Sequence, residues 1–309
     1  MDSRIIGRYE GREKGPLLIC IGGMHGNEPS AIKAIGEVFR LLAVEPDLNP
    51  SFHYRGAMIG VRGNLAALKL KQRFVNRDLN RMLIPEEIER IQKLSPEERS
   101  AEDRECIELV TLVKEERKRY NAPLTLILDM HTTTADGGIF TIAAEDELSR
   151  VLAKGLHAPV VLGIAEDLIG TTIHFFHDPI SNCYCIVFEA GQHDDPGAVH
   201  RSVAAIINCM RSIGSVDSGD VDHRHDGLLI SLSVGLPKIT RLAYHYKIKP
   251  EEDFIMNEGF ENFQQVRAGD VLGRSNNLSV IAPMDGLILM PKYQSKGDDG
   301  FFIVEVVEA

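Results

Sequence analysis

The chain has 309 residues, of which 44% are hydrophobic, and its formal net charge is −11. This length and composition suggest about two domains with a sizeable core, and they exclude a disordered chain. The acidic balance argues against nucleic acid and anionic membranes as partners, because both require a basic face on the protein.

The sequence also bears on the compartment of the protein. No apolar run approaches the roughly 18–20 residues that span a bilayer, and the N-terminal MDSRIIGRYEGREKG lacks the features of a signal peptide. The five cysteines form neither a CxxC pair nor a zinc-ribbon pattern, and we interpret them as reduced core thiols. We therefore expect a cytoplasmic protein.

The first 120 residues predict alternating strands and helices. The apolar run GPLLICIGG, which is bounded by glycines, is typical of a buried strand. Pro29 suits the first turn of the helix that follows, and Ser95-Pro96 interrupts a later, charged helical segment whose charges we interpret as a solvated face. The elements expected here are strands at 15–23 and 57–64 and helices at 28–43, 65–70 and 86–119.

The next segment continues this alternation up to about residue 213. Its apolar runs, such as APLTLILDMH and NCYCIVFEAG, predict buried strands between amphipathic helices. The expected elements are strands at 122–131, 137–144 and 182–191 and helices at 145–156 and 195–213. Apolar strands that alternate with helices indicate an α/β sandwich around a largely parallel sheet.

The pattern changes after residue 213. The segment GSVDSGDVDHRHD is polar and acidic, which is typical of an exposed connection. Beyond it, short β-like runs separated by Gly, Asn, Pro and Asp turns predict strands and almost no helix. We therefore expect an α/β domain at 1–215, a linker at about 216–225 and a smaller all-β domain at 226–309.

Three of the predicted strands end in residues that suit metal chemistry. His25 and Glu28 share one turn after the first strand, His131 ends another, and Glu189 ends a third. Ligands bind at the carboxyl ends of strands in open α/β sheets, and two histidines with one glutamate form a common catalytic zinc set. A phosphate-binding turn is the alternative, but GGMHGNEP contains neither GK[ST] nor GxGxxG.

Four motifs in order carry a more specific resemblance. HGNE (25–28), RFVNRDLNR (73–81), DMHTTT (129–134) and EAG (189–191) resemble the succinylglutamate desuccinylase and aspartoacylase family, which is related to zinc carboxypeptidases. The resemblance covers the whole chain. It implies a zinc carboxypeptidase-like three-layer αβα sandwich with a mixed, largely parallel sheet, followed by the smaller C-terminal β domain.

The resemblance also implies roles for individual residues. His25, Glu28 and His131 match the ligands of one zinc ion per chain, and Glu189 matches the general base. Arg73 matches the arginine that polarises the scissile carbonyl, and Asn80 and Arg81 match the pair that binds the amino-acid portion of the substrate. Asp129 lies two residues before His131. It is expected to accept a hydrogen bond from the ring nitrogen of a zinc histidine that does not bind the metal, with His25 as the expected partner.

The chain departs from the family pattern upstream of Glu189. Aspartoacylases use a further arginine and tyrosine there to contact the carboxylate of the acyl chain, whereas HFFHDPIS (174–181) contains neither. Acetylaspartate and succinylglutamate are therefore doubtful as substrates. His174 and His177 are interpreted as loop or pocket residues, with a second metal site as the alternative, and Arg77 is either a surface residue or a substrate contact.

The C-terminal segment APMDGLILMPK loosely resembles a lipoyl- or biotinyl-type carrier. Carrier domains place their modified lysine in a tight turn such as MKM, whereas Lys292 follows a proline. We therefore expect this domain to shape or shield the cleft.

The sequence predicts a zinc-dependent hydrolase that removes an acyl group from a small N-acylated amino acid or related amine. The enzymatic alternative is a carboxypeptidase-like hydrolase of a short peptide or amino-acid amide, and the other is a zinc- or ligand-binding protein without activity. Cobalt, nickel or manganese would also suit a His2Glu site. The sequence leaves open whether the chain forms a homo-oligomer.

Overall fold

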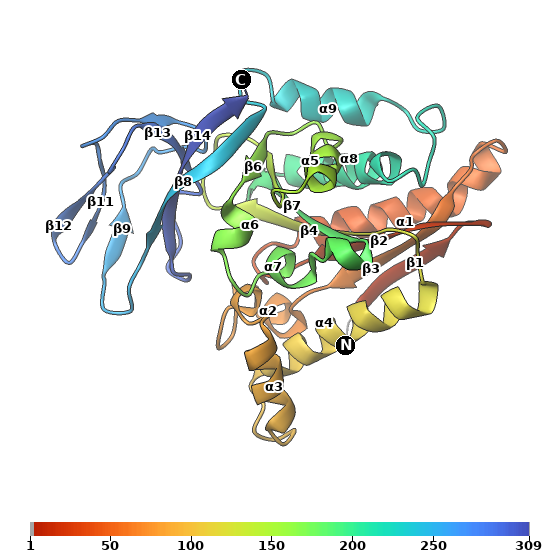
Figure 1. The fold of residues 1–309 in the computed structure, drawn as a ribbon, viewed down its shortest axis with the longest axis horizontal. Coiled ribbons are helices and arrows are strands. Elements are labelled where there is room, and N and C mark those ends of the chain that lie inside the picture. The colour runs from red at the N-terminus through yellow and green to blue at the C-terminus, as the bar shows by residue number, and fades with distance from the viewer. Residues whose placement is uncertain (1–2, 309) are drawn as a thin grey trace.

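A computed structural model describes residues 3–308, and an eleven-stranded mixed sheet runs through it in the order β1-β3-β2-β4-β7-β5-β6-β8-β14-β13-β10 (Figure 1). Parallel pairings join β3, β2, β4 and β7, while β1 and β5 pair antiparallel with β3 and β7. The strands are β1 (Ile5–Glu10), β2 (Glu13–Gly22), β3 (Arg55–Arg62), β4 (Thr125–Thr133), β5 (Phe140–Ile142), β6 (Val160–Leu162), β7 (Cys183–Gln192), β8 (Ile239–Lys247), β10 (Gln265–Val266), β13 (Gly286–Leu289) and β14 (Asp299–Glu308).

Helices cover both faces of this sheet and make three layers. Alternate residues of β2 point to opposite sides: Leu18 packs in the cluster that α1 and α8 cover, and Ile19 packs in the cluster that α3 and α4 cover. The helices are α1 (Ser30–Leu48), α2 (Leu65–Leu70), α3 (Pro85–Lys93), α4 (Ala101–Tyr120), α5 (Glu147–Lys154), α6 (Ile164–Asp167), α7 (Thr172–Phe176), α8 (Gly197–Ser212), α9 (Arg224–Leu232) and the short 3₁₀ helices η1 (Leu79–Arg81) and η2 (Pro179–Ser181). The predicted fold class is confirmed.

Local signals explain several of these elements. Helix α1 begins directly after Pro29, and the break expected at Ser95-Pro96 separates α3 from α4. Helix α4 then starts with a capping box, in which Ser100 and Asp103 each accept a hydrogen bond from the other's backbone N–H. Every residue of β4 is buried, as its continuous apolar run predicts for a central parallel strand.

The C-terminal strands continue the main sheet. Strand β8 pairs parallel with β6 and antiparallel with β14, so the sheet runs without interruption from the α/β part into the β part. A second sheet, formed by β9 (Phe254–Met256), β11 (Val271–Ser275) and β12 (Leu278–Ile281), packs beside it. These strands project from the α/β part (Figure 1). The division of the chain into two domains stays a prediction.

One segment differs from the sequence prediction. Residues 227–309 were expected to contain almost no helix, but Arg224–Leu232 forms α9. Asp226 in its first turn pairs with Arg211 of α8, and Leu229 belongs to the core cluster that α8 covers. The polar composition before residue 226 concealed this helix, because its stability comes from packing on α8 and not from a strong periodic pattern.

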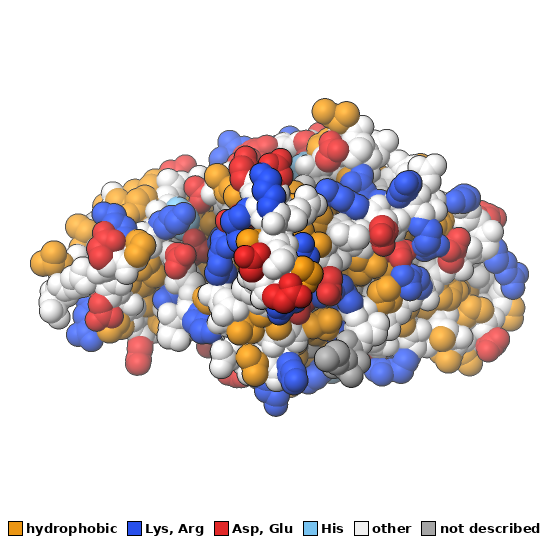
Figure 2. Space-filling model, turned by 90° about the horizontal axis from the view of Figure 1, so that it is seen from below, with side chains coloured by type: hydrophobic (Ala, Val, Ile, Leu, Met, Phe, Trp, Pro, Cys, Tyr) orange, Lys and Arg blue, Asp and Glu red, His pale blue; other side chains and the backbone are white. Residues whose placement is uncertain are grey.

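The surface and the cysteines add two observations. On the face drawn in Figure 2, acidic and basic side chains are interspersed and do not separate into regions of one sign. All five cysteines are buried and unpaired. None of the helices within residues 3–308 is long and apolar enough to cross a bilayer.

Candidate metal centre

His25, Glu28 and His131 come together at the carboxyl ends of β2 and β4. His25 Nδ1 lies 2.8 Å from Glu28 Oε1, and His131 Nδ1 lies 2.9 Å from Glu28 Oε2. All three residues are at most 5% exposed. One ligand atom from each residue lies within 4.8 Å of the others, and this is the one such group of His, Cys, Asp and Glu residues within 3–308. The convergence predicted from the strand ends is therefore present.

Close packing places the turn that carries two of these residues. Gly26 lies against the backbone of Ala67 and Gln72, and a Cβ on Gly26 would lie 2.1 Å from the Ala67 carbonyl carbon. The Gly26 N–H donates to the Arg73 carbonyl at 3.3 Å. Glycine is required at this position because two backbone segments approach each other closely. The hydrogen bond from Gly26 also connects the HGNE turn to the segment that begins at Arg73.

Each histidine has its own aspartate on the far side of the ring. His25 Nε2 lies 3.2 Å from Asp78 Oδ1, and His131 Nε2 lies 3.0 Å from Asp129 Oδ2. The expected pairing of Asp129 with His25 is therefore wrong: Asp129 contacts His131, because both project to the same side of β4. The sequence analysis missed Asp78, although it lies inside the quoted RDLNR motif.

These contacts fit a divalent metal. Each Nε2 can donate its hydrogen to its own aspartate, which leaves two Nδ1 lone pairs and the Glu28 carboxylate as three donors that face one another. Two imidazoles and one carboxylate are a donor set that zinc prefers. Burial alone would raise the pKa of Glu28, but the adjacent histidines hold it well below its ordinary value.

Glu189 lies beside this cluster at the end of β7. The register of β4 and β7 places it opposite His131, and it lines the same cavity as the three candidate ligands. Burial raises the pKa of Glu189 to about 7. Its Oε2 atom is buried and has no hydrogen-bond partner among the described residues. A carboxyl group with such a pKa can both accept and release a proton near neutral pH.

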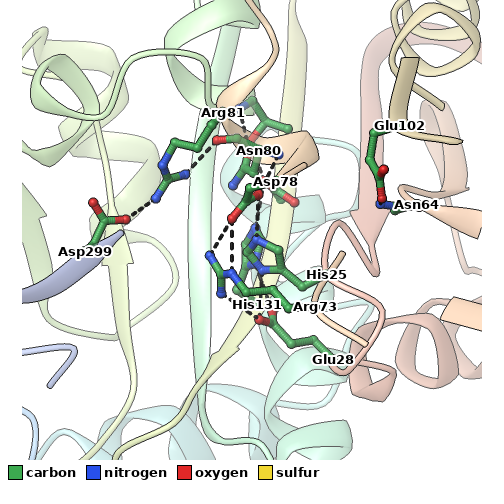
Figure 3. Close-up of polar contacts among 12 residues, drawn as sticks. His25, Glu28, Asn64, Arg73, Asp78, Asn80, Arg81, Glu102, His131 and Asp299 are labelled. Atoms are coloured by element: carbon green, nitrogen blue, oxygen red, sulfur yellow. Dashed lines mark hydrogen bonds and ion pairs between the residues drawn. The ribbon is translucent and has the colours of Figure 1, made fainter. Parts of the chain in front are cut away.

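Arg73 lies next to the cluster and contacts the same aspartate as His25. Its Nε and Nη2 atoms donate to Asp78 Oδ2 at 3.1 and 2.9 Å, while Nη1 lies 4.0 Å from Glu28 Oε1 (Figure 3). Asp78 thus holds the guanidinium of Arg73 and the ring of His25 at the same time. The charge of Arg73, followed by the interaction with His25, keeps the pKa of Asp78 well below its ordinary value despite its burial.

Asn80 and Arg81 lie in η1 and also line the cavity. Asn80 Oδ1 accepts a hydrogen bond from the Thr172 backbone at 2.9 Å, so its side-chain oxygen is already used by the protein. Arg81 Nη1 donates to the Asn80 carbonyl at 2.6 Å, and its Nη2 forms an ion pair with Asp299 of β14 (Figure 3). The C-terminal strands therefore contribute directly to the cavity.

Glu102, at the start of α4, holds the segment that carries these arginines. It is fully buried and accepts hydrogen bonds from the backbone N–H groups of Val75 and Asn76 at 2.7 and 2.9 Å. Asn64 donates to the same carboxylate at 3.2 Å (Figure 3). The sequence analysis counted Glu102 among the solvated charges of 86–119, and no sequence signal distinguishes it from them.

His193 lines the cavity, and the sequence analysis missed it. Its Nδ1 lies 2.7 Å from the Thr132 hydroxyl, and the Thr132 backbone N–H donates to Glu28 at 3.2 Å. Its Nε2 is buried without a partner among residues 3–308. Only its place four residues after Glu189, at the same strand end, could have indicated it.

The remaining candidates from the sequence lie outside the cavity lining. His174 is exposed, and His177 pairs with Asp146 at 3.0 Å, so the two do not face a common metal. Arg77 pairs with Glu87 at 3.0 Å. The apolar part of the lining consists of Ile142, Ile164, Leu168, Ile173, Val187, Met290 and Phe302, and threonines and two lysines also line the cavity.

Comparison with known proteins agrees with this geometry. Residues 14–211 match the catalytic domain of the succinylglutamate desuccinylase/aspartoacylase family. Because this match spans more than half of the chain, the protein belongs to this family of hydrolases.

Individual relatives are distant. The chain is 36% identical over 73 residues to the succinylglutamate desuccinylase of Pseudomonas syringae pv. tomato, a match that spans 24% of this chain and 20% of that protein. It resembles the crystal structure of the succinylglutamate desuccinylase from Chromobacterium violaceum with a TM-score of 0.64 and 19% identity, covering 97% of this chain and 86% of the other. The enzyme of the same name from Vibrio cholerae gives a TM-score of 0.65 at 17% identity, with coverage of 94% and 81%. These structures support the fold.

Proposed function

We propose that the protein is a zinc-dependent hydrolase that cleaves the amide bond of a small N-acylated amino acid or related N-acyl amine. His25, Glu28 and His131 would hold one zinc ion per chain. The observation that carries the proposal is the convergence of these three donors with Glu189 on one cavity. The reaction is expected in the cytoplasm, and the partner is a small molecule.

The chain's own groups suit amide hydrolysis. A bound zinc ion lowers the pKa of a water ligand to about 7 and polarises a carbonyl oxygen. Glu189 takes a proton from the attacking water and delivers it to the leaving amine, and its pKa of about 7 suits both steps. Arg73, held by Asp78, stabilises the negative charge that develops on the carbonyl oxygen.

Asn80 and Arg81 are proposed to position the amino-acid portion of the substrate. Both line the cavity, which encloses about 120 Å³. An apolar cavity of about 150 Å³ accepts a molecule the size of benzene, so this volume suits a small substrate or one end of it. Asp129 is proposed to orient His131 for metal binding, because it accepts a hydrogen bond from the ring nitrogen opposite Glu28.

Metal content and turnover test the proposal together. The purified protein is expected to hold about one zinc ion per chain, and the zinc-loaded form should release free amine from members of an N-acyl amino acid panel. His25→Ala and His131→Ala should each abolish tight zinc binding. Full zinc occupancy in both variants would refute the metal site.

The same assay separates the alternatives. Hydrolysis of dipeptides or amino-acid amides in preference to N-acyl amino acids would favour the carboxypeptidase-like alternative. Tight zinc binding without turnover of any compound would favour a binding protein. The Glu189 oxygen without a hydrogen-bond partner among residues 3–308 lies beside the three donors and supports an enzyme.

A further inference from the structure

Four cationic side chains line the cavity, and three of them already have partners. Arg73 is bound to Asp78, and Arg81 is paired with Asp299 (Figure 3). Lys296 donates to the Phe74 carbonyl at 2.6 Å and to Gln72 Oε1 at 3.2 Å. Lys292, the fourth, makes neither a hydrogen bond nor an ion pair through its ammonium with the residues of 3–308.

The pairing of Arg81 is part of a longer chain of charges. Asp299 also lies 3.0 Å from His245 Nε2, and His245 Nδ1 lies 2.7 Å from Asp167. Both oxygens of Asp299 are therefore used, and its pKa is held well below its ordinary value by His245 and Arg81 despite burial. A substrate carboxylate would have to compete with this internal carboxylate for Arg81.

Lys292 is held in place by its backbone. The Lys292 N–H donates to the Gly300 carbonyl at 3.0 Å. Its neighbours are anchored to the residue that follows β4, since the Thr134 hydroxyl donates to the Pro291 carbonyl and accepts from the Tyr293 N–H, both at 3.1 Å. Burial, with the nearby charge of Arg73, lowers the pKa of Lys292. A partly buried cation that forms no direct ion pair with any of residues 3–308 gains free energy from an anionic ligand.

We propose that Lys292 binds the carboxylate of the substrate's amino-acid portion, in addition to Asn80 and Arg81 in the lining of the same cavity, because Arg81 is already paired with Asp299. This inference rests on the proposed function. Lys292 lines the same cavity as Arg81 and the three candidate metal ligands, and its backbone is bonded to Gly300, the residue after Asp299. The substrate class is therefore an N-acyl amino acid with a free carboxylate, and not an uncharged N-acyl amine.

Binding of three matched compounds tests the proposal. N-acetyl-L-leucine carries a carboxylate on the amine side of the amide, and N-succinyl-L-leucinamide carries one on the acyl side. N-acetyl-L-leucinamide carries none. Affinities are measured by calorimetry on zinc-loaded Glu189→Gln protein, so that no substrate is consumed. Adding Lys292→Met should weaken binding of N-acetyl-L-leucine by about tenfold or more, because a charge-assisted contact is lost, and leave the other two within about twofold.

The controls separate charge from folding. Lys292→Arg should restore most of the affinity, and Arg77→Gln, which removes an exposed cation paired with Glu87, should change nothing. The proposal is overturned if the parent protein binds the acid no better than the amide. It is equally overturned if Lys292→Met weakens all three compounds alike, or only the succinyl compound. Absence of turnover in the wild type would refute the proposed function and leave this binding comparison intact.

Discussion

Two buried glutamates at the cavity have different surroundings. Both oxygens of Glu28 contact histidine nitrogens, whereas Oε2 of Glu189 has no partner among the described residues. The pKa of Glu28 is lowered and that of Glu189 is raised to about 7. A permanently ionised carboxylate suits a metal ligand, and one that titrates near neutrality suits a proton carrier.

This difference predicts opposite phenotypes for two conservative variants. Glu189→Gln keeps the shape of the side chain but removes the proton acceptor, so turnover should fall by about 10²–10⁴-fold while zinc content stays near one per chain. Glu28→Gln should weaken zinc binding, and excess zinc should partly restore its activity. Metal content and turnover are measured on both proteins. Zinc loss in Glu189→Gln, with zinc retained in Glu28→Gln, would reverse the two roles.

At the scale of secondary structure, the site depends on elements that carry no catalytic group. The segment from Arg73 to Arg81 contains only one short 3₁₀ helix, and Glu102 at the N-terminal end of α4 accepts backbone hydrogen bonds from its centre. A negative charge is also favourable at this end of a helix. Helix α4 therefore holds the two arginines at the cavity.

Loss of this carboxylate should impair both stability and catalysis. Glu102→Ala leaves buried N–H groups without an acceptor, which costs about 1–3 kcal/mol of unfolding free energy, and kcat should fall because Arg73 loses its position. Denaturant unfolding and steady-state kinetics measure the two effects. Glu108→Ala on the same helix removes an exposed partner of Arg4 and serves as the matched control. Unchanged kcat in Glu102→Ala would show that Arg73 is positioned without α4.

At the scale of the whole molecule, the cavity walls come from distant parts of the chain. Its apolar lining includes Ile142 of β5, Ile173 of α7, Val187 of β7 and Phe302 of β14. Segment 174–181 adds no cation, because His174 is exposed and His177 is paired with Asp146. These walls offer an acyl chain an apolar surface.

We therefore expect neutral acyl groups to be preferred over those with a terminal carboxylate. N-acetyl amino acids should be hydrolysed with a kcat/KM at least about tenfold above that of the matching N-succinyl amino acids, because a carboxylate against apolar walls loses hydration without compensation. Parallel assays of acetyl and succinyl derivatives of one amino acid provide the measurement. A faster reaction with the succinyl compound would place an additional cation at the acyl chain.

The sequence by itself determined the fold class and the candidate ligands. Buried strands appear as continuous apolar runs, and the ends of parallel strands meet at one edge of the sheet. Placing His25, Glu28, His131 and Glu189 together required only these local signals and the order of the motifs. The helix α9 escaped this reasoning because its formation depends on packing against α8.

Only the tertiary structure decided which charged groups are already paired. Asp299 lies 218 residues from Arg81 in the sequence and reaches it through the pairing of β6 with β8 and of β8 with β14. Asp129 contacts His131 and not His25, and Glu102 is buried although it belongs to a charged segment. Sequence patterns report burial and turns within about one element, whereas ion pairs depend on strand order and register between elements far apart. That the ammonium of Lys292 pairs with no group of residues 3–308 is therefore a property of the folded chain that no motif encodes.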